Sequence, residues 1–323
     1  MNPKLTVSLG LWQDRPAREA LETAALADEL RFPELWIGEM ATYDAFALAV
    51  AVAARTSSIM LTPGPLPVAV RDPMMIAMAV ASLADLTGRV AGVAIGTSSP
   101  HVVERWHGRE RRDPPTALAE SAEVLRHLLA GERAGFEGRT VRVQDYRLRL
   151  PAPRSPITIA AFGAAAVRAA ARHADRMVVS LVTADSAGRL AARLRSESDA
   201  AGTSAPPVAA WVPVAVDGGA QAREQVRRAV VGYLAAPGYA QMFEEAGFGD
   251  VVALARSRPH PSELLAAVPD ELVHAVAALG GPEEVAARLA SYAVDEIAVL
   301  PCCTEEDPAG EHTLRTLAAW TGP

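Results

Sequence analysis

Short apolar runs alternate along the chain with longer segments in which apolar residues recur at helical spacing. The runs are bounded by Gly, Pro, Asp or Ser, which is typical of buried strands separated by turns. We expect strands at residues 5–11, 34–37, 59–62, 90–95, 157–160, 176–179, 208–216 and 296–300. Strands that alternate with helices predict an α/β fold, and eight parallel strands can close a (β/α)8 TIM barrel. A doubly wound open sheet is the alternative, but no GxGxxG motif follows the first strand.

Helix boundaries in the sequence agree with this alternation. Pro16 stands at the expected start of the first helix, and Asp72 followed by Pro73 is typical of a helix N-cap with proline in the first turn. Gly88 is placed to end that helix.

Two segments interrupt the simple repeat. Residues 132–150 contain alternating apolar residues and are expected to form a short hairpin before the fifth strand. Residues 235–279 are mostly helical in pattern and too long for a plain connection. We expect them to form a helical insertion between strands seven and eight of a single domain that spans 1–323. Arg256 and Arg258 in this insertion either meet anionic parts of a ligand or are ordinary surface residues.

The segment 45–54 reads AFALAVAVAA and is apolar on every side. A helix on the outside of a barrel normally keeps one face in water, so this one needs a second surface to cover it. Homodimerisation through this helix is one interpretation. Complete burial by the neighbouring helix and the insertion is the other.

The composition is that of a globular chain with a large core. Its 323 residues are 50% hydrophobic and carry a formal net charge of −7 at pH 7. An acidic chain offers little to attract a polyanion, so nucleic acid is not expected as a partner. The apolar runs are shorter than the roughly 20 residues that span a bilayer, and no signal-peptide pattern opens the chain, so we expect a cytoplasmic protein. Cys302 and Cys303 are adjacent, which suits neither a disulfide framework nor a CxxC motif.

Five sequence segments occur in the order and spacing of one known family. They are WIGEM at 36–40, TPGPLPVAVRDP at 62–73, GTSSPHVVERWHG at 96–108, ITIAAFG at 157–163 and DEIAVLPCC at 295–303. Together they resemble the luciferase-like monooxygenase superfamily, and within it the oxidoreductases that use the deazaflavin coenzyme F420. The resemblance implies a TIM barrel that holds its cofactor at the carboxyl ends of the strands.

The resemblance also implies where the ring of the cofactor lies. Thr62, Gly64 and Pro65 match the segment in which several F420 enzymes carry a cis peptide that bulges under the middle ring. An X-Pro bond adopts the cis form at a cost of only about 0.5–1 kcal/mol, so a cis Gly64-Pro65 bond is expected. A trans proline turn with no role beyond stiffness is the alternative.

The end of the fourth expected strand matches the segment that bonds the polar edge of the ring. Gly96 would admit the ring, and Thr97 and Ser98 would offer hydrogen-bond donors. The alternative is a turn that caps the next helix, because Ser98 or Ser99 before Pro100 fits an N-cap with proline in the first turn.

The phosphate of the cofactor is expected after strand five, where small residues lead directly into a helix. Unpaired amides and the positive end of a helix dipole suit an anion. In the family this segment grips the cofactor phosphate, and the matching residues are Ala161, Phe162, Gly163 and Ala164. Phe162 departs from the Gly or Ser that the family usually has there. Ser180 matches a hydroxyl that also contacts phosphate.

Two residues are candidates for catalysis. Glu39 is the acidic residue expected at the cleft edge, where it is either a proton-transfer group or a salt-bridge partner. The imidazole of His107 suits proton donation or a phosphate contact if it faces the cleft. His101, Glu104 and His107 recur every three residues, but this spacing differs from the zinc motif HExxH, and no metal is expected.

Two absences favour reduction over oxidation. Relatives that oxidise sugar phosphates resemble this chain but carry a His where Met40 stands, as a base, and a Glu where Ser99 stands, as an acid. Removing hydride from an alcohol needs a base on its hydroxyl. We therefore expect a reductase in which reduced F420 passes hydride to an activated C=C or C=N bond of a small specialised metabolite. An FMN-dependent monooxygenase and a catalytically silent flavin-binding barrel are the alternatives.

Overall fold

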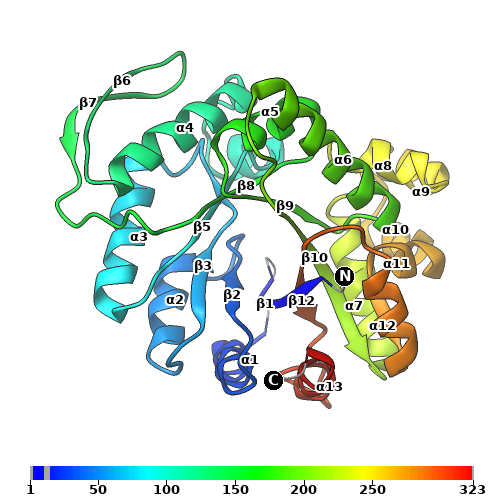
Figure 1. Cartoon of the computed structure of the whole chain (residues 1–323). Helices are drawn as coiled ribbons and strands as arrows, with labels where there is room; N and C mark the ends of the chain where they lie inside the picture. The colour runs from blue at the N-terminus through cyan, green and yellow to red at the C-terminus, as the bar shows by residue number, and fades with distance from the viewer. Residues whose placement is uncertain (1–2, 11–14, 322–323) are drawn as a thin grey trace.

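The computed structural model describes residues 3–10 and 15–321. Within them eight parallel strands form a barrel: β1 (Lys4–Ser8), β2 (Glu34–Ile37), β3 (Met60–Pro63), β5 (Val93–Gly96), β8 (Ile157–Ala160), β9 (Arg176–Ser180), β10 (Val208–Val216) and β12 (Glu296–Pro301). They pair in the order β3, β2, β1, β12, β10, β9, β8, β5, and helices surround them (Figure 1). The predicted α/β barrel is confirmed. The expected end of the first strand, at residue 11, lies outside the described residues.

The barrel closes where the chain changes its pairing partner after β3. Strand β3 pairs with β2, whereas the short strand β4 (Leu66–Pro67) pairs with β5. Nearer the start of β3, Leu61 and Ala91 form an isolated parallel bridge. The turn at Gly64 and Pro65 therefore lies where the third and fourth barrel strands meet.

The outer layer consists of helices that follow the strands. They are α1 (Ala17–Glu29), α2 (Ala45–Ala53), α3 (Pro73–Thr87), α4 (Pro114–Leu129), α5 (Ala164–His173), α6 (Ala184–Ala201), α7 (Gly219–Val231), α12 (Pro282–Ala290) and α13 (Glu311–Thr321). Their ends follow the expected signals. Asp72 caps α3 by accepting from the amides of Met74 and Met75 at 2.9 Å each, and Gly88 ends it with a φ of 67°. No helix in the described ranges is long and apolar enough to cross a membrane.

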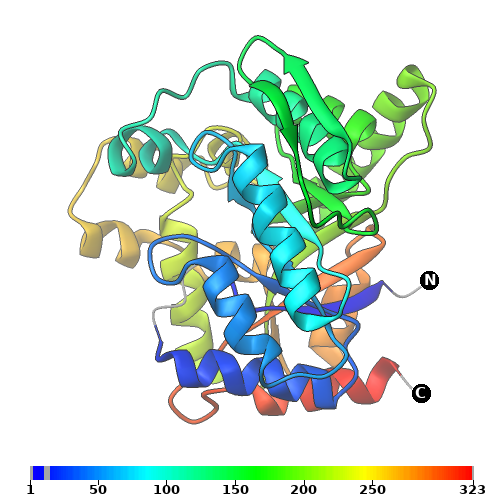
Figure 2. The same cartoon turned by 90° about the vertical axis from the view of Figure 1, so that its left-hand side faces the viewer.

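A helical excursion lies between β10 and β12, as the sequence predicts. It contains α8 (Tyr239–Glu245), α9 (Gly249–Arg256), α10 (Pro261–Ala267) and α11 (Asp270–Val276), and it ends in β11 (Ala278–Gly280), which pairs with β10. Figure 2 shows these helices on the same side of the barrel as the short π-helix η1 (His101–Trp106) that follows β5. The expected hairpin, β6 (Arg133–Glu137) with β7 (Arg142–Arg147), projects beside α4 (Figure 1). η1 follows the carboxyl end of β5, and Tyr239 of α8 bonds to Ser180 at the carboxyl end of β9, so both stand at the barrel mouth.

Two tryptophans fill the middle of the barrel. Trp36 on β2 and Trp211 on β10 are buried, and their rings meet edge to face with centroids 5.7 Å apart. The residues around them are small, which leaves the room that two indoles need: Ala94, Val178, Ala209 and Ala298. The indole N–H of Trp211 has no hydrogen-bond partner in the described part of the chain. The barrel is therefore a packed core and not a pore.

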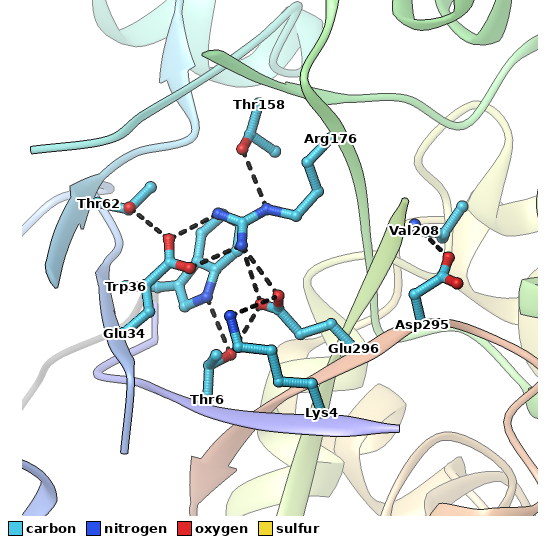
Figure 3. A network of polar contacts seen from close by, with 10 residues as sticks. All are labelled: Lys4, Thr6, Glu34, Trp36, Thr62, Thr158, Arg176, Val208, Asp295 and Glu296. Atoms are coloured by element: carbon cyan, nitrogen blue, oxygen red, sulfur yellow. Dashed lines mark hydrogen bonds and ion pairs between the residues drawn. The ribbon is translucent and has the colours of Figure 1, made fainter. Parts of the chain in front are cut away.

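Toward the amino ends of the strands, an arginine joins opposite walls of the barrel (Figure 3). Arg176 makes a bidentate ion pair with Glu34 of β2, with N–O distances of 2.6 and 2.7 Å. It also reaches Glu296 of β12 at 3.0 Å and donates to the hydroxyl of Thr158 at 3.3 Å. Its guanidinium carbon lies 4.1 Å from the ring centroid of Trp36. The buried charges are thus paired and hydrogen-bonded, as burial requires.

Burial and pairing act in opposite directions on these groups. Burial alone would lower the pKa of Arg176, but its bonds to the two carboxylates raise that pKa above the ordinary value. For Glu296 burial has the larger effect and raises the pKa, although Arg176 favours the ionised form. Two carboxylates face one buried guanidinium, and the half-exposed Lys4 reaches Glu296 only at 4.0 Å. The network therefore depends on Arg176 as its main cation.

Replacing Arg176 by Met should lower the free energy of unfolding by about 3–5 kcal/mol at neutral pH, because two buried carboxylates lose their cation. The deficit should shrink as the pH falls, because carboxylates that are buried without a cation bind protons in the folded chain before they do so in the unfolded one. Urea unfolding at several pH values measures both effects. Arg126→Met is the control, since Arg126 pairs with Asp175 at 2.8 Å on the surface and should matter by less than about 1 kcal/mol. Equal losses in the two variants would contradict this account.

Apolar side chains are exposed on α2, which the segment 45–54 forms, and also on the next helix, α3. Exposed apolar side chains on α2 and α3 are Ala47, Val50, Ala51, Met75, Met78 and Leu86. Complete burial of the 45–54 helix by its neighbours, the alternative interpretation, is therefore wrong. Pairing of two copies through this face stays a prediction.

If two copies pair through α2 and α3, Met78→Glu should shift the protein toward monomers, because a carboxylate would then be buried in an apolar contact. Light scattering after size-exclusion chromatography measures the mass at several concentrations. Leu150→Glu is the matched control, since Leu150 is a comparably exposed apolar residue outside these helices. A wild-type protein that stays monomeric at all concentrations would show the prediction to be wrong.

Candidate active site

The Gly64-Pro65 turn forms one wall of the barrel mouth. The peptide bond between the two residues is cis, as the resemblance implied. Gly64 has a φ of 118°, and a Cβ atom there would lie 2.2 Å from the carbonyl oxygen of Ala94, so only glycine fits. On the neighbouring strand, a Cβ on Gly96 would come within 3.2 Å of Ala160 and 3.7 Å of Pro65. The backbone at Gly96 therefore packs closely against β8 and Pro65, and a side chain there would crowd both.

Thr97 and Ser98 continue from Gly96 into a turn that Arg111 holds. Ser98 has a left-handed backbone with a φ of 53°. Nη2 of Arg111 donates to the carbonyl of Ser98 at 2.9 Å and to the hydroxyl of Thr97 at 3.4 Å. Nε of the same side chain is buried and has no partner within residues 3–10 and 15–321. Burial lowers the pKa of Arg111, and the charge of Glu104 opposes this only in part.

The first turn of α5 presents backbone amides at the mouth. Gly163 is the N-cap, and no side chain of the described residues caps this helix. Gly163 is exposed, and a Cβ there would meet nothing within 4 Å. The amide of Ala161, in contrast, donates to the carbonyl of Val178 at 3.2 Å inside the core. Gly163 and Ala164 therefore suit an anion, whereas Ala161 supports the end of β8.

Phe162 and Ser180 are joined by the insertion. Tyr239, the first residue of α8, lies against Phe162 with ring centroids 4.7 Å apart, and its hydroxyl donates to the carbonyl of Ser180 at 2.9 Å. Gly238 precedes it with a φ of 86°, and a Cβ there would approach the ring of Phe162 to 3.0 Å. Burial raises the pKa of Tyr239, so its phenol stays a neutral donor. The insertion therefore covers the ends of β8 and β9, where Tyr239 contacts Phe162 and bonds to Ser180.

Glu39 is held in an ion-pair cluster after β2. Arg71 binds both of its carboxylate oxygens, at 2.8 and 2.6 Å, and the amide of Ala45 donates to it at 3.0 Å. Arg71 also pairs with Asp44, the N-cap of α2. The bond to Glu39 is the main reason that the pKa of Arg71 is raised. The geometry of Glu39 is thus that of a salt-bridge partner, and its carboxylate is not free for proton transfer.

His107 follows η1, and its side chain is exposed. It makes no side-chain hydrogen bond or ion pair within the described ranges, so the structure does not tie it to the mouth. Ser99 accepts from the amide of Val102 at 3.3 Å, as the helix-cap interpretation expects. No group of three or more His, Cys, Asp or Glu side chains is placed to hold a metal among the residues that the structure describes.

Thr62 belongs to the barrel interior. Its side chain is fully buried, and its hydroxyl donates to Glu34, the main partner of Arg176. A Cβ on Gly92 would lie 2.4 Å from the Thr62 hydroxyl, so the backbone packs closely around it. The structure therefore does not bring Thr62 to the predicted cofactor surface, because this position of β3 faces inward.

Comparison with known proteins places this barrel in a family. A model of the luciferase-like monooxygenase family matches residues 5–296. The chain belongs to this family. The F420-dependent glucose-6-phosphate dehydrogenase of Nakamurella multipartita is 36% identical over 132 residues, which are 40% of this chain and 39% of that protein. The 4-hydroxyprotoasukamycin monooxygenase of Streptomyces nodosus subsp. asukaensis is 32% identical over 130 residues, 38% of this chain and 33% of that protein.

These matches span well under half of either relative, whereas the fold is shared along the whole chain. The coenzyme F420-dependent tetrahydromethanopterin reductase of Methanopyrus kandleri superposes with a TM-score of 0.84 over 98% of both chains. The two sequences are 19% identical, so this likeness shows the luciferase-like fold alone.

In this luciferase-like barrel the predicted site residues fall into two groups at the mouth. One group contains Gly64, Pro65, Gly96, Thr97 and Ser98, and the other contains Phe162, Gly163, Ala164 and Ser180. Four other predicted residues belong to neither group. Thr62 and Ala161 are buried, Glu39 is paired with Arg71, and the side chain of His107 is exposed. Arg256 pairs with Glu244 inside the insertion.

Sequence reasoning missed Arg111 and Tyr239. Arg111 lies in the run RERRDPP, where nothing in the pattern distinguishes one arginine from its neighbours. Tyr239 follows Gly238, and a glycine-aromatic pair at the start of a helix in the insertion is the signal that could have drawn attention to it.

Glu39→Gln should lower the free energy of unfolding by about 1–3 kcal/mol, because Arg71 loses a charged bidentate partner. Binding of F420 should be unchanged, because the carboxylate is engaged by Arg71 and Ala45. Urea unfolding and fluorescence titration measure the two properties, with Glu104→Gln as a control on the exposed face of η1. A variant that keeps its stability and loses ligand affinity would restore the catalytic interpretation of Glu39.

Proposed function

We propose that this chain is an F420-dependent reductase that transfers hydride from reduced F420 to an activated C=C or C=N bond of a small molecule. The observation that carries the proposal is the combination, at one barrel mouth, of the Gly64-Pro65 wall, the neighbouring Gly96 without a side chain and the uncapped first turn of α5. Backbone without side chains is a surface on which a flat ring can lie, and free amides at a helix start suit an anionic tail.

Each group at the mouth then has a role in holding the cofactor. Pro65 and Gly96 support the ring, Thr97 and Ser98 face its polar edge, and the amides that follow Gly163 bind the phosphate. Bound F420 supplies the hydride chemistry, which no amino-acid side chain provides. The contribution of the chain is to orient ring and acceptor and to keep water from the reacting atoms.

The side chains near the mouth support reduction and not oxidation. Oxidation of an alcohol needs a base on its hydroxyl. Met40 and Ser99 stand where the resemblance implies His and Glu in sugar-phosphate-oxidising relatives, and Glu39 is bound by Arg71. Reduction of a polarised double bond needs only a proton to complete the product, and water can deliver it. A mouth in which Glu39 is paired and Met40 and Ser99 offer no base is therefore suited to a reductase.

An FMN-dependent monooxygenase is the second candidate. The name of the family and the similarity to 4-hydroxyprotoasukamycin monooxygenase support it. Reduced FMN reacts with oxygen, whereas the deazaflavin ring has carbon in place of the nitrogen that this reaction needs. A catalytically silent flavin-binding barrel is the third candidate, and binding experiments separate all three.

Purified protein should bind F420, quench its fluorescence and show no oxygen uptake with the reduced cofactor. Gly96→Val should weaken F420 binding by at least about tenfold, because a branched side chain would collide with Ala160 and Pro65 and displace the wall on which the ring is proposed to lie. Gly135→Val is the matched control, since Gly135 is exposed on β6 and a Cβ atom there would meet nothing within 4 Å. Fluorescence titration with F420 and with FMN, together with thermal unfolding of both variants, makes the measurement.

Tight FMN binding with oxygen consumption would support the monooxygenase in place of the reductase. Binding of neither cofactor would support the silent barrel. Equal F420 affinity in Gly96→Val and the wild type would contradict the position given to the ring.

A further inference from the structure

Arg111 is a cation at the barrel mouth that no carboxylate among the described residues pairs with. It lies in the loop between η1 and α4, and its Nη2 atom donates hydrogen bonds to the carbonyl of Ser98 and the hydroxyl of Thr97. Its Nε atom is buried and has no partner among residues 3–10 and 15–321. Arg111 as a whole is half-buried, but a buried Nε atom without a partner costs stability, so its presence needs a reason outside the fold.

Two other arginines, one after β4 and one in the insertion, have carboxylate partners. Arg71 pairs with Glu39 and Asp44, and Arg256 pairs with Glu244. Arg111 forms no ion pair in the described part of the chain, and Glu104, whose charge raises the pKa of Arg111, is exposed on η1. The positive charge beside Thr97 and Ser98 is thus available to an anionic group of a ligand.

We propose that Arg111 is the counter-charge for the pyrimidine edge of reduced F420. The inference rests on the proposed function, which places the polar edge of the ring at Thr97 and Ser98. Hydride enters the deazaflavin ring at C5, and the negative charge that this adds spreads over N1 and the C2 oxygen at that edge. Charge placed near N1 is one of the few ways in which a protein tunes such a ring.

The balance of the reaction shows when this charge exists. Reduced F420, deprotonated at N1, gives up hydride from C5: the C5–H bond breaks, two electrons and one proton leave, and the ring becomes neutral. A C–H bond forms on the acceptor, which now carries the negative charge and takes a proton from water. Arg111 therefore faces an anion before the transfer and a neutral ring after it.

This difference makes Arg111 a residue that selects the redox state of the cofactor. It holds the reduced form more tightly than the oxidised form, which favours release of spent cofactor and uptake of fresh reduced cofactor. A reductase that uses F420 as a co-substrate needs this order of affinities. The same contact stabilises the reduced ring and so makes it a weaker hydride donor. Arg111 therefore favours exchange of the cofactor but lowers the driving force for hydride transfer.

The test is the ratio of the Kd for oxidised F420 to the Kd for reduced F420, measured by anaerobic fluorescence and absorbance titration. The ratio should exceed one in the wild type and fall about tenfold in Arg111→Gln, because a hydrogen bond to a charged group is lost. A tenfold change corresponds to about 30 mV in the two-electron potential of the bound cofactor, which spectroelectrochemistry measures independently. Arg111→Lys keeps the charge and should recover part of the ratio.

Arg112→Gln is the matched control, because it removes the same charge from a neighbouring position and should leave the ratio unchanged. A ratio unchanged in Arg111→Gln, or equal weakening of both redox forms, would show that Arg111 only shapes the Ser98 turn and would overturn the inference. If Arg111→Gln does not fold, a wild type that binds oxidised F420 as tightly as reduced F420 overturns it. A wild type that binds neither form overturns the proposed function as well.

Discussion

The guanidinium of Arg176 connects strands that are far apart in the sequence. Its partners Glu34 and Glu296 stand at the starts of β2 and β12, while Thr62 on β3 donates to Glu34 and Thr6 on β1 donates to Glu296. With Thr158 on β8, strands from both halves of the chain meet in one buried network at their amino ends. TIM barrels keep stability at this face and chemistry at the opposite one, and the network follows that division.

Strand β3 connects this network to the barrel mouth. The hydroxyl of Thr62 is fixed by Glu34, and Gly92 lets the next strand pass against it at a distance that no side chain would allow. Two residues later the chain makes the Gly64-Pro65 turn and transfers its pairing from β2 to β5. Glu34, a buried acid at the start of β2, thus holds the residue of β3 from which the Gly64-Pro65 wall of the candidate site continues.

Much of the fold could be predicted from local patterns, and the site only in part. Strand β10 has the predicted bounds, because a long apolar run between turn residues is typical of a buried strand. The direction of Thr62 could not be predicted, because parallel strands are buried on both faces and their pattern does not show which side is inward. The pairing of Arg71 with Glu39 joins residues 32 positions apart, and only the packed loops bring them together.

Two independent features of the mouth set its electrostatics in the same direction. The loop after β3 supplies Arg71, which neutralises Glu39, and the loop after η1 supplies Arg111, which nothing in the described chain neutralises. The first removes a base, and the second adds an unpaired positive charge. Tyr239 then bonds the insertion to Ser180. Under the proposed function, exclusion of water by the insertion would strengthen the field of an uncompensated charge. A mouth of this kind would then receive negative charge and not remove a proton, so the redox state of a bound ring, more than the acidity of a substrate, is the property that the proposal gives this barrel to control.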